Sequence, residues 1–467
     1  MAVLKNYRYL LPYTLLLFFL LSYIYNPSVS AHGDQVHTFI DSAGEQKEKI
    51  QECLAMPEGE DLCYFAVCEG QNSYLCAQDI LDAVVFLAGP EEATRVLEDI
   101  MASTLFAIQT DGHQLSHVIG RATSHHFGLS GESFLRCPAD FNYGCQHGFF
   151  EDALIQHTTP VKAATEICEH IPDRPYKNKF YCYHGVGHGF MFHESYHLKN
   201  ALDLCDALPS FTAQEGCYQG VFMENVNGFF SDAEGEKGFI DNDTLAPCNR
   251  IEDKYRHQCY ENHASYILSH HNNSIRDASH ACLDAEDYIS SCINSLGLMV
   301  TNPGWQQTLR GSFNGTFIEI AAHLCNQFPA DYIEICQLAA ISNLSNFDTT
   351  DIRRQVELCL FFEGNTDRCF ETIGTLLINV AASQDEIMKS CEAAPEEFRD
   401  ECYTPNLSQQ QQNATNEQDK TTTGLSSFQL PYPVLIVGCA IPAIFLIYYF
   451  YRSKKKRERF INKQITH

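Results

Sequence analysis

The sequence predicts an all-α protein whose extracellular part is made of disulfide-stapled helix-pair repeats, as in an α-solenoid or an α/α-toroid. A signal peptide and one C-terminal transmembrane helix are expected at its ends. Three observations support this: cysteine pairs recur along most of the chain, apolar residues recur at helical spacing before them, and an apolar run lies near each end. Together they indicate an exported, membrane-anchored helical protein.

Residues 1–31 have the features of a cleaved export signal. Lys5 and Arg8 precede an apolar run from Leu10 to Ile24, and small residues follow at Ser28 to Ala31. A basic start, an apolar run and small residues in this order are typical of a secretory signal peptide. We therefore expect the mature chain to begin near residue 32.

The opposite end of the chain indicates a membrane anchor over residues 430–451. Its apolar run would cross most of a bilayer as a helix, at about 1.5 Å per residue. The basic residues 452–467 follow directly and are expected in the cytoplasm, which makes the chain a single-pass type I protein of the cell surface. An uncleaved amino-terminal anchor and a lipid anchor are the alternatives, although a lipid anchor does not account for the basic tail. The polar residues 403–429 should form a disordered stalk.

The exported part is strongly acidic and contains potential N-glycosylation sites. The net charge is −28; the signal contributes +2 and the tail +6, so the exported part carries −28 − 2 − 6 = −36. Such an acidic surface argues against nucleic acid as a partner and favours an unknown extracellular ligand or protein. Potential N-glycosylation sites occur at Asn242, Asn272, Asn314, Asn343, Asn406 and Asn413.

Cysteine spacing predicts the repeats. One of the 21 cysteines, Cys439, lies in the expected membrane span, and the other 20 form an even set in an oxidising compartment, which favours disulfides. The second cysteines of the pairs recur every 33 to 44 residues, a period typical of two-helix repeats. Each short bridge should stabilise the fold by on the order of 2–3 kcal/mol. The predicted pairs are Cys137–Cys145, Cys168–Cys182, Cys205–Cys217, Cys248–Cys259, Cys282–Cys292, Cys325–Cys336, Cys359–Cys369 and Cys391–Cys402.

Four further cysteines, whose pairing the sequence leaves open, lie in an amino-terminal helical region over residues 32–110. Residues 111–241 form a histidine-rich helical region, and residues 242–402 continue the disulfide-linked repeats. The amino-terminal cysteines are Cys53, Cys63, Cys68 and Cys76.

The first helix of each repeat should end at its first cysteine, and a following proline marks the start of the second helix in several repeats. Thr212 with Glu215, and Ser383 with Glu386, have the spacing of a capping box at a helix start. The predicted first helices are Val161 to Cys168, Leu198 to Cys205, Ile275 to Cys282, Phe317 to Cys325, Ile352 to Cys359 and Gln384 to Cys391.

Histidines concentrate in the region 111–241, where 11 of the chain's 20 lie. His113 with His117, and His184 with His188, are four residues apart and would project from one side of a helix. His147 follows its cysteine by two residues, as His184 does. Because imidazole suits Zn²⁺, Cu²⁺ and Fe²⁺, these five histidines are the candidate ligands of a transition-metal site.

Polar residues near these histidines complete the candidate site. Glu151 and Glu224 are candidate catalytic groups, as further ligands or as acid/base residues. Gln219 and Arg121 are candidate cofactor-binding residues, because Gln219 takes the place of a histidine in the next repeat and Arg121 could hold an anionic ligand. Arg121 could instead hold Glu151 or form a plain surface salt bridge.

Glycines in expected helix interiors lie beside the histidines. Each costs about 1 kcal/mol relative to alanine, so a close approach of a ligand or of another backbone should require them. Packing of helices alone is the alternative reason, just as histidines at a helix interface can be ordinary core residues. The glycines are Gly148, Gly185, Gly187, Gly189 and Gly220.

Two other metal motifs receive less weight. His193 to His197 match the zinc-protease pattern His-Glu-x-x-His, but His197 aligns with the expected start of a helix, so the motif should straddle a turn. Cleavage after Ala31 would make His32 an amino-terminal copper chelator with His37 nearby. Such a ligand set resembles the histidine brace of copper monooxygenases, whose β-sandwich this helical sequence does not match.

The sequence thus supports two classes of function. One is a metal-dependent protein, either a hydrolase that activates water beside Glu151 or a copper redox protein. The other is a non-enzymatic surface receptor or scaffold that binds a protein or glycan through its repeat surface. Motifs for covalent haem, phosphate loops, serine nucleophiles and EF-hands do not occur.

Overall fold

The structure is a computed structural model. The expected signal peptide, transmembrane helix and basic tail lie outside the residues it describes, as do His32 and His37. The same holds for the expected stalk over 403–429, except for residues 403–405, which are helical and not disordered as predicted. None of the helices within the described part is long and apolar enough to cross a membrane. The described residues are 44–56, 60–68, 73–103, 105–106, 112–155, 157–172, 176–302, 305–306, 315–348, 350–362, 364, 366–381 and 383–405.

The fold is all-α, as predicted. Within the described ranges the one β feature is an isolated bridge between Ile240 and Asp243. Short 3₁₀ helices (η1 to η4) lead into several α-helices. The α-helices are α2 (Gly44–Leu54), α3 (Glu60–Val67), α4 (Ser73–Ala88), α5 (Pro90–Ala102), α6 (His113–Phe127), α7 (Gly131–Leu135), α8 (Asp140–Ile155), α9 (Pro160–Cys168), α10 (Tyr176–His193), α11 (Leu198–Asp206), α12 (Phe211–Phe230), α13 (Asp253–Glu261), α14 (Ala264–His270), α15 (Ile275–Ala281), α16 (Ile289–Met299), α18 (Phe317–Cys325), α19 (Ile333–Asp348), α20 (Arg353–Phe361), α21 (Thr366–Val380) and α22 (Gln384–Cys391).

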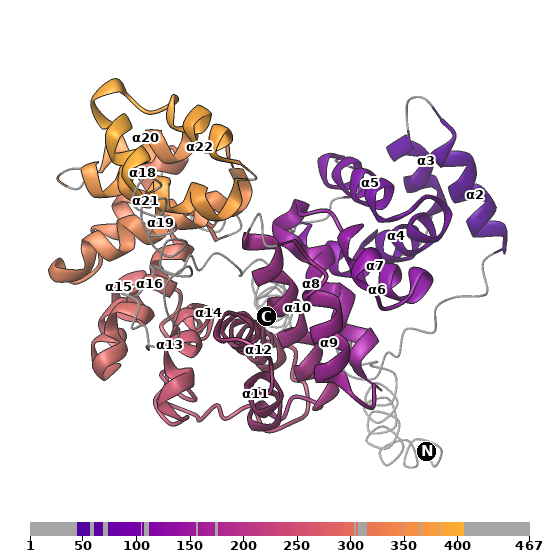
Figure 1. The fold of residues 1–467 in the computed structure, drawn as a ribbon, viewed down its shortest axis with the longest axis horizontal. Coiled ribbons are helices and arrows are strands. Elements are labelled where there is room, and N and C mark those ends of the chain that lie inside the picture. The colour runs from indigo at the N-terminus through magenta and orange to yellow at the C-terminus, as the bar shows by residue number, and fades with distance from the viewer. Residues whose placement is uncertain are drawn as a thin grey trace, which may run out of the picture.

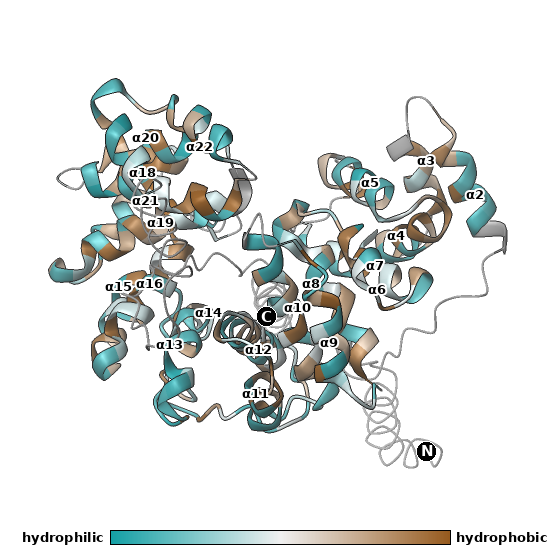
Figure 2. Ribbon diagram, in the orientation of Figure 1, coloured by the Kyte–Doolittle hydropathy of each residue, from teal (hydrophilic) through white to brown (hydrophobic). Residues whose placement is uncertain are grey.

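These helices follow a broad arc (Figure 1). The helices α2 to α5 lie at one end, α6 to α12 in the middle and α18 to α22 at the other end. Helices α8 and α10 also contact α19 and α21, so the later part of the chain returns to the middle of the arc. Figure 2 shows hydrophobic and hydrophilic residues on the same helices, as expected for elements that bury one face.

All eight predicted disulfides are present, which confirms the reading of the cysteine spacing. The amino-terminal cysteines pair in sequence order, as Cys53–Cys63 and Cys68–Cys76. Each bridge links consecutive parts of the chain, with Cα atoms 5.3 to 5.9 Å apart. The eight are Cys137–Cys145, Cys168–Cys182, Cys205–Cys217, Cys248–Cys259, Cys282–Cys292, Cys325–Cys336, Cys359–Cys369 and Cys391–Cys402.

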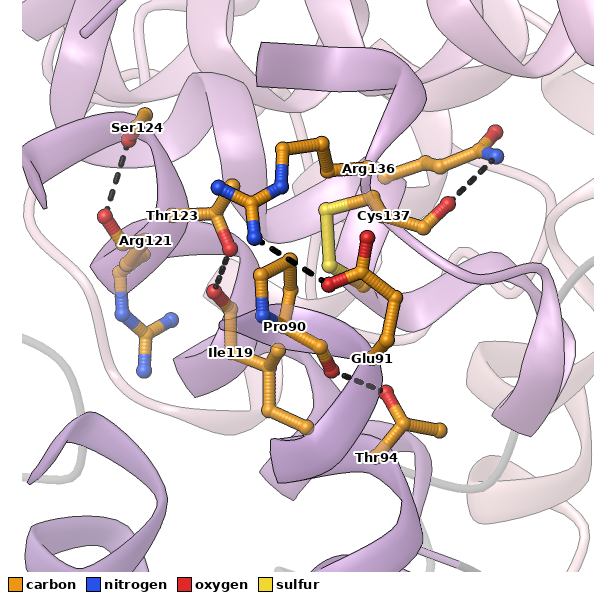
Figure 3. The surroundings of a disulfide bond; sticks show 11 residues. Pro90, Glu91, Thr94, Ile119, Arg121, Thr123, Ser124, Arg136 and Cys137 are labelled. Carbon is orange, nitrogen blue, oxygen red and sulfur yellow. Dashed lines mark hydrogen bonds and ion pairs between the residues drawn. A yellow bond between two sulfur atoms is a disulfide. The ribbon is translucent and has the colours of Figure 1, made fainter. Parts of the chain in front are cut away.

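The surroundings of Cys137–Cys145 show how a bridge joins neighbouring elements (Figure 3). Arg136, next to the bridge, forms an ion pair with Glu91 of α5 at 3.4 Å. The amide of Gln146 on α8 donates to the carbonyl of Cys137 at 3.4 Å. This disulfide therefore lies where the amino-terminal helices meet the histidine-bearing ones.

The predicted first helices also form, and α18 and α22 end at the predicted cysteines. Ser383 caps α22 by accepting the backbone N–H of Glu386, as its spacing predicts. The capping box of Thr212 with Glu215 is wrong. Ser210 is the N-cap of α12 instead, because its side chain accepts the N–H of Ala213.

One potential glycosylation site is inconsistent with a glycan. Asn343 is buried on α19, where its amide donates to the hydroxyl of Thr301 at 3.2 Å. A glycan on this nitrogen would have to leave the protein interior. The sites at Asn242 and Asn272 lie in turns, both in left-handed conformations, and those at Asn314, Asn406 and Asn413 lie outside the described residues.

Candidate metal centre

Helices α6, α8, α10 and α12 pack against one another in that order, and glycines set their separation. A Cβ atom on Gly148 of α8 would lie 2.1 Å from the carbonyl oxygen of His117 on α6. On Gly220 of α12 it would lie 1.9 Å from the carbonyl oxygen of His184 on α10. Backbone atoms leave no room for a side chain at these two positions, so alanine would push the helices apart.

Glycines also allow the close contact between α8 and α10. Cβ atoms on Gly185 and Gly189 would each lie 2.7 Å from a carbonyl oxygen of α8. Helix packing therefore accounts for the mid-helix glycines, and no ligand is needed to explain them. Their effect on the site is indirect, because the short helix separation lets side chains from neighbouring helices meet.

Five histidines from α6, α8 and α10 gather in the interior. The ring centre of His147 lies 5.3 Å from that of His113 and 5.6 Å from that of His117. It also lies 4.7 Å from His184 and 5.2 Å from His188. All five are buried, and His147, His184 and His188 have 0 % of their surface exposed.

The histidines form two trios of suitable size for a metal ion. His113, His117 and His147 make the first trio, and His147, His184 and His188 make the second; the ligand atoms of each trio lie within 4.8 Å of one another. Imidazoles that share a tetrahedral ion at 2.0–2.1 Å have ring centres about 5 Å apart. The structure thus brings together all five predicted ligands. A third trio of similar size combines Glu151, His188 and Glu224.

The first trio contains a contact that needs a cation. Nδ1 of His113 lies 2.7 Å from the carbonyl oxygen of Phe141, an acceptor, so this nitrogen carries the proton. Burial, together with the neighbouring His117, lowers the pKa of His113 to about 3, so its ring is neutral and Nε2 presents a lone pair.

His117 has the same arrangement, because its Nδ1 is bonded to a carboxylate oxygen of Glu151. Its Nε2 lies 3.0 Å from Nε2 of His113. With both rings neutral, two lone pairs would face each other, which is repulsive. A cation shared by these nitrogens, either a proton or a metal ion, resolves the conflict.

Glu151 is held by two partners. Arg121 donates to its Oε2 at 2.5 Å while Oε1 accepts from His117. The side chains of Arg121 and Glu151 are only 12 % and 3 % exposed, so the alternative of a surface salt bridge is wrong. Burial raises the pKa of Glu151, but the charges of His117 and Arg121 outweigh it and hold this pKa below its usual range.

The second trio has a matching carboxylate. Glu224 on α12 accepts from Nδ1 of His188 at 2.9 Å, from Tyr196 at 2.7 Å and from Asn227 at 3.2 Å. Nε2 of His188 is left facing Nε2 of His184 at 3.2 Å. A carboxylate that holds one nitrogen of a histidine fixes the other nitrogen for a metal, as in carboxylate–histidine–metal triads.

Two histidines of the cluster lack partners that a core residue would have. Both ring nitrogens of His147 and Nδ1 of His184 are buried without a hydrogen-bond partner among the described residues. Burial, followed by the neighbouring histidines, lowers the pKa of both rings well below its usual value, so they are neutral. A neutral imidazole always carries one N–H. In His184 this proton can lie on Nε2, which faces Nε2 of His188 at 3.2 Å, but in His147 it has no acceptor among the described residues, which costs about 1–3 kcal/mol. A metal ion at a ring nitrogen of His147 would give this ring a partner.

Gln219 points to the next helix pair. Its amide donates to Glu261 of α13 at 3.4 Å, beside Glu215, which accepts from Gln258 at 3.2 Å. Burial raises the pKa of Glu215 to about 7. Gln219 thus bonds to the buried carboxylate of Glu261 rather than to the histidines.

Sequence reasoning missed two residues that orient the histidines. Phe141 supplies its carbonyl from a run of three left-handed residues, Phe141 to Tyr143, with φ between 51° and 62°. Tyr196 also has a left-handed φ of 58° and packs tightly against Gly228. Non-glycine residues rarely adopt this conformation, and nothing in the local sequence announces it.

The zinc-protease motif does not form, as its alignment predicts. Helix α10 ends at His193, and Ser195 and Tyr196 turn the chain before α11 begins at Leu198. His193 contacts the carbonyl oxygen of Leu154 at 2.8 Å, while His197 is the N-cap of α11. The two histidines therefore do not share a helix face.

Comparison of the chain with models of protein families, with curated proteins and with solved structures finds no match. The geometry of the site is therefore the basis for its function.

Proposed function

We propose that the chain is an exported metalloprotein whose five clustered histidines bind a transition metal. One observation carries the proposal: oxygen acceptors hold Nδ1 of His113, His117 and His188, which leaves three Nε2 atoms pointing into the cluster. Histidines that bind metals are oriented in this manner. The unpaired nitrogens of His147 and His184 add two further ligand positions.

The all-nitrogen ligand set favours copper. Imidazole suits copper, zinc and iron, and for a given set of ligands Cu²⁺ binds most tightly among the divalent first-row ions. Copper is therefore the first metal to test, with zinc and iron as the other two. The pattern does not include thiolates, because the extracellular cysteines of the described part form disulfides.

Redox chemistry or metal storage is favoured over hydrolysis. A hydrolase needs a carboxylate or another base that is free to take a proton from metal-bound water. Here both oxygens of Glu151 are bonded, to His117 and Arg121, and both oxygens of Glu224 are bonded as well. These residues orient ligands. Electron transfer also suits a centre whose histidines are fully buried, because it does not require a substrate to touch the ion.

We propose a membrane-anchored, extracellular array of helix-pair repeats as the setting for this centre. The ten disulfides support the extracellular location, since such bonds persist in oxidising compartments. The signal and anchor rest on the apolar runs at the two ends of the sequence. An extracellular protein or ligand is the expected partner.

Metal analysis of the full chain tests the proposal. The protein is purified without a histidine tag, and bound metals are counted by mass spectrometry. We expect at least one transition-metal ion per chain, with fewer ions bound when His184 and His188 are both changed to alanine and none when His113 and His117 are changed as well. The exposed His125 of α6 provides the control, because His125→Ala should leave the metal content unchanged.

Circular dichroism and the disulfide count establish that the variants fold. A folded wild-type chain that binds no transition metal, even after incubation with Cu²⁺, Zn²⁺ or Fe²⁺, would overturn the proposal. That result would favour the non-enzymatic receptor or scaffold, in which the histidines are core residues.

A further inference from the structure

His147 occupies a special position, because it belongs to both histidine trios. It lies on α8, between the two histidines of α6 and the two of α10. Its ring centre is 5.3 Å from that of His113 and 4.7 Å from that of His184. The other four histidines each belong to one all-histidine trio only.

The ring of His147 also differs in its bonding. Nδ1 and Nε2 are both buried and both lack a hydrogen-bond partner among the described residues. In His113, His117 and His188, by contrast, Nδ1 is held by an oxygen and only Nε2 remains for a metal. His147 is therefore the one member of the cluster with two nitrogens to offer and a trio on either side.

The two trios do not merge into one site. Three-residue groups are the largest sets of close ligand atoms found in the described part of the chain, although five histidines lie in the cluster. One ion could thus be bound fully by either trio but not by all five rings at once. Two ion positions that share His147 use every histidine.

We propose that the centre holds two metal ions bridged by the imidazole ring of His147. His113 and His117 bind the first ion, His184 and His188 bind the second, and His147 gives one ring nitrogen to each. The ring loses its remaining N–H proton to solvent as the second ion binds, so it bridges as an imidazolate anion. This inference rests on the proposed metal-binding function and adds the number of ions and their link.

The carboxylates suit this arrangement. Glu151 holds a histidine of the first ion and Glu224 holds a histidine of the second. Each ion would thus have a buried carboxylate behind one of its ligands, which partly balances its charge. Arg121 neutralises Glu151, whereas Glu224 pairs with His188 among the described residues. A second ion at His188 supplies the positive charge that Glu224 otherwise lacks.

Copper loading of the full chain tests the bridge. The chain is stripped of metal and titrated with Cu²⁺, the copper retained after desalting is measured, and the unpaired spins are counted by electron paramagnetic resonance near liquid-helium temperature. An imidazolate links two Cu²⁺ ions magnetically. We therefore expect two coppers per chain at this centre, with a spin count severalfold below the copper content once the second has bound.

Substitution of His147 alone distinguishes bridging of two ions from binding of metal by the other histidines. In His147→Gln the ions that remain should be uncoupled, so that the spin count equals the copper content. His125→Gln on α6 is the matched control and should retain the coupling. Copper held elsewhere on the chain would appear equally in both variants.

The outcomes separate the two proposals. Only one copper per chain at the centre, or two coppers whose spins add in full, would overturn the bridge while leaving the metal site standing. A folded chain that retains no copper would overturn both.

Discussion

Nε2 of His113 and Nε2 of His117 lie 3.0 Å apart, and the Nδ1 atom of each ring is held by an oxygen acceptor. This contact requires a proton or a metal ion between the two nitrogens. The oxygens fix which nitrogen of each ring carries the proton, so the two that face each other can meet only around a cation.

Breaking the buried ion pair between Arg121 and Glu151 should destabilise the protein strongly. Arg121→Met keeps the apolar stem but leaves Glu151 without its guanidinium, which should cost about 3–5 kcal/mol. Urea unfolding with intact disulfides measures this, and the double variant with Glu151→Gln should cost less than the sum of the single ones. Lys199→Met is the control, because its ion pair with Asp203 is exposed to solvent, which screens it, and should contribute far less. Equal effects of the two substitutions would refute the buried pair.

Tyr196→Phe should weaken metal binding without unfolding the chain. It removes the hydrogen bond to Glu224 and so loosens the carboxylate that orients His188. Loss of such a supporting bond typically lowers metal affinity by about 10–100-fold. Competition with a coloured chelator measures the change. Tyr288→Phe, which loses a bond to Asp253 outside the helices that carry the histidines, should not alter affinity. An unchanged affinity in Tyr196→Phe would show that Glu224 does not act through His188.

Two glycines of α12, one turn apart, should respond differently to alanine. At Gly220 the new Cβ would lie 1.9 Å from the carbonyl oxygen of His184, whereas at Gly216 it would lie 2.9 Å from that of Phe180. Gly220→Ala should therefore separate α10 from α12, with a cost of about 1–3 kcal/mol and a loss of metal affinity. Gly216→Ala should cost less, because its clash is milder and the gain of about 1 kcal/mol from alanine in a helix can offset it. Thermal unfolding and metal content of the two variants provide the comparison, and similar losses would contradict it.

Removal of a disulfide should lower metal affinity only where that disulfide holds a helix that carries the clustered histidines. Replacing Cys168 and Cys182 by serine should lower stability by about 2–5 kcal/mol and reduce metal affinity, because Cys182 precedes His184 by two residues on α10. Replacing Cys359 and Cys369 should lower stability alone. The two double variants are compared by unfolding and by chelator competition. A loss of affinity in both would mean that metal binding reports only general stability.

Glu215 should make stability fall as the pH rises. Burial raises its pKa in the folded chain to about 7, above the ordinary value of 4.5. Between these values the folded state binds more protons than the unfolded state, so the contribution is complete below pH 4.5 and is lost as the pH passes 7. Relative to Glu215→Gln, the wild type should lose on the order of 1 kcal/mol over this range, after allowance for solvent screening. Urea unfolding at several pH values measures the difference, and parallel curves would contradict the shift.

Local signals explain why much of the fold was predictable. A first helix ends at its cysteine and a proline follows, so helix ends and disulfide partners lie within about 15 residues of each other in the sequence. The failure at Thr212 has a local cause too. Ser210 stands two residues earlier, directly after Pro209. Its side chain accepts the N–H of Ala213, so the helix begins before Thr212 could cap it. The arrangement of the pairs as a solenoid or toroid depends on contacts between repeats and stays a prediction.

The clustered histidines, which are the candidate metal ligands, were predictable because their spacing is local. The residues that orient them were not. His113 and His117 share a helix face whatever lies opposite. The carbonyl that holds His113 comes from Phe141, in a left-handed run that periodicity does not reveal. The burial of Arg121 depends on the packing of α8 against α6, which the sequence does not show. The bonds of Glu151 to His117 and Arg121, which favour a role in orienting His117 over one in catalysis, also appear only in the fold.

X-ray absorption at the metal edge of the loaded full chain shows whether the histidines hold the ion. We expect a first shell of nitrogens at about 2.0–2.1 Å with the outer-shell scattering of several imidazole rings, lost when His113, His117, His184 and His188 are all changed to alanine. A metal bound without imidazole scattering, or a spectrum that the variant leaves unchanged, would contradict this expectation.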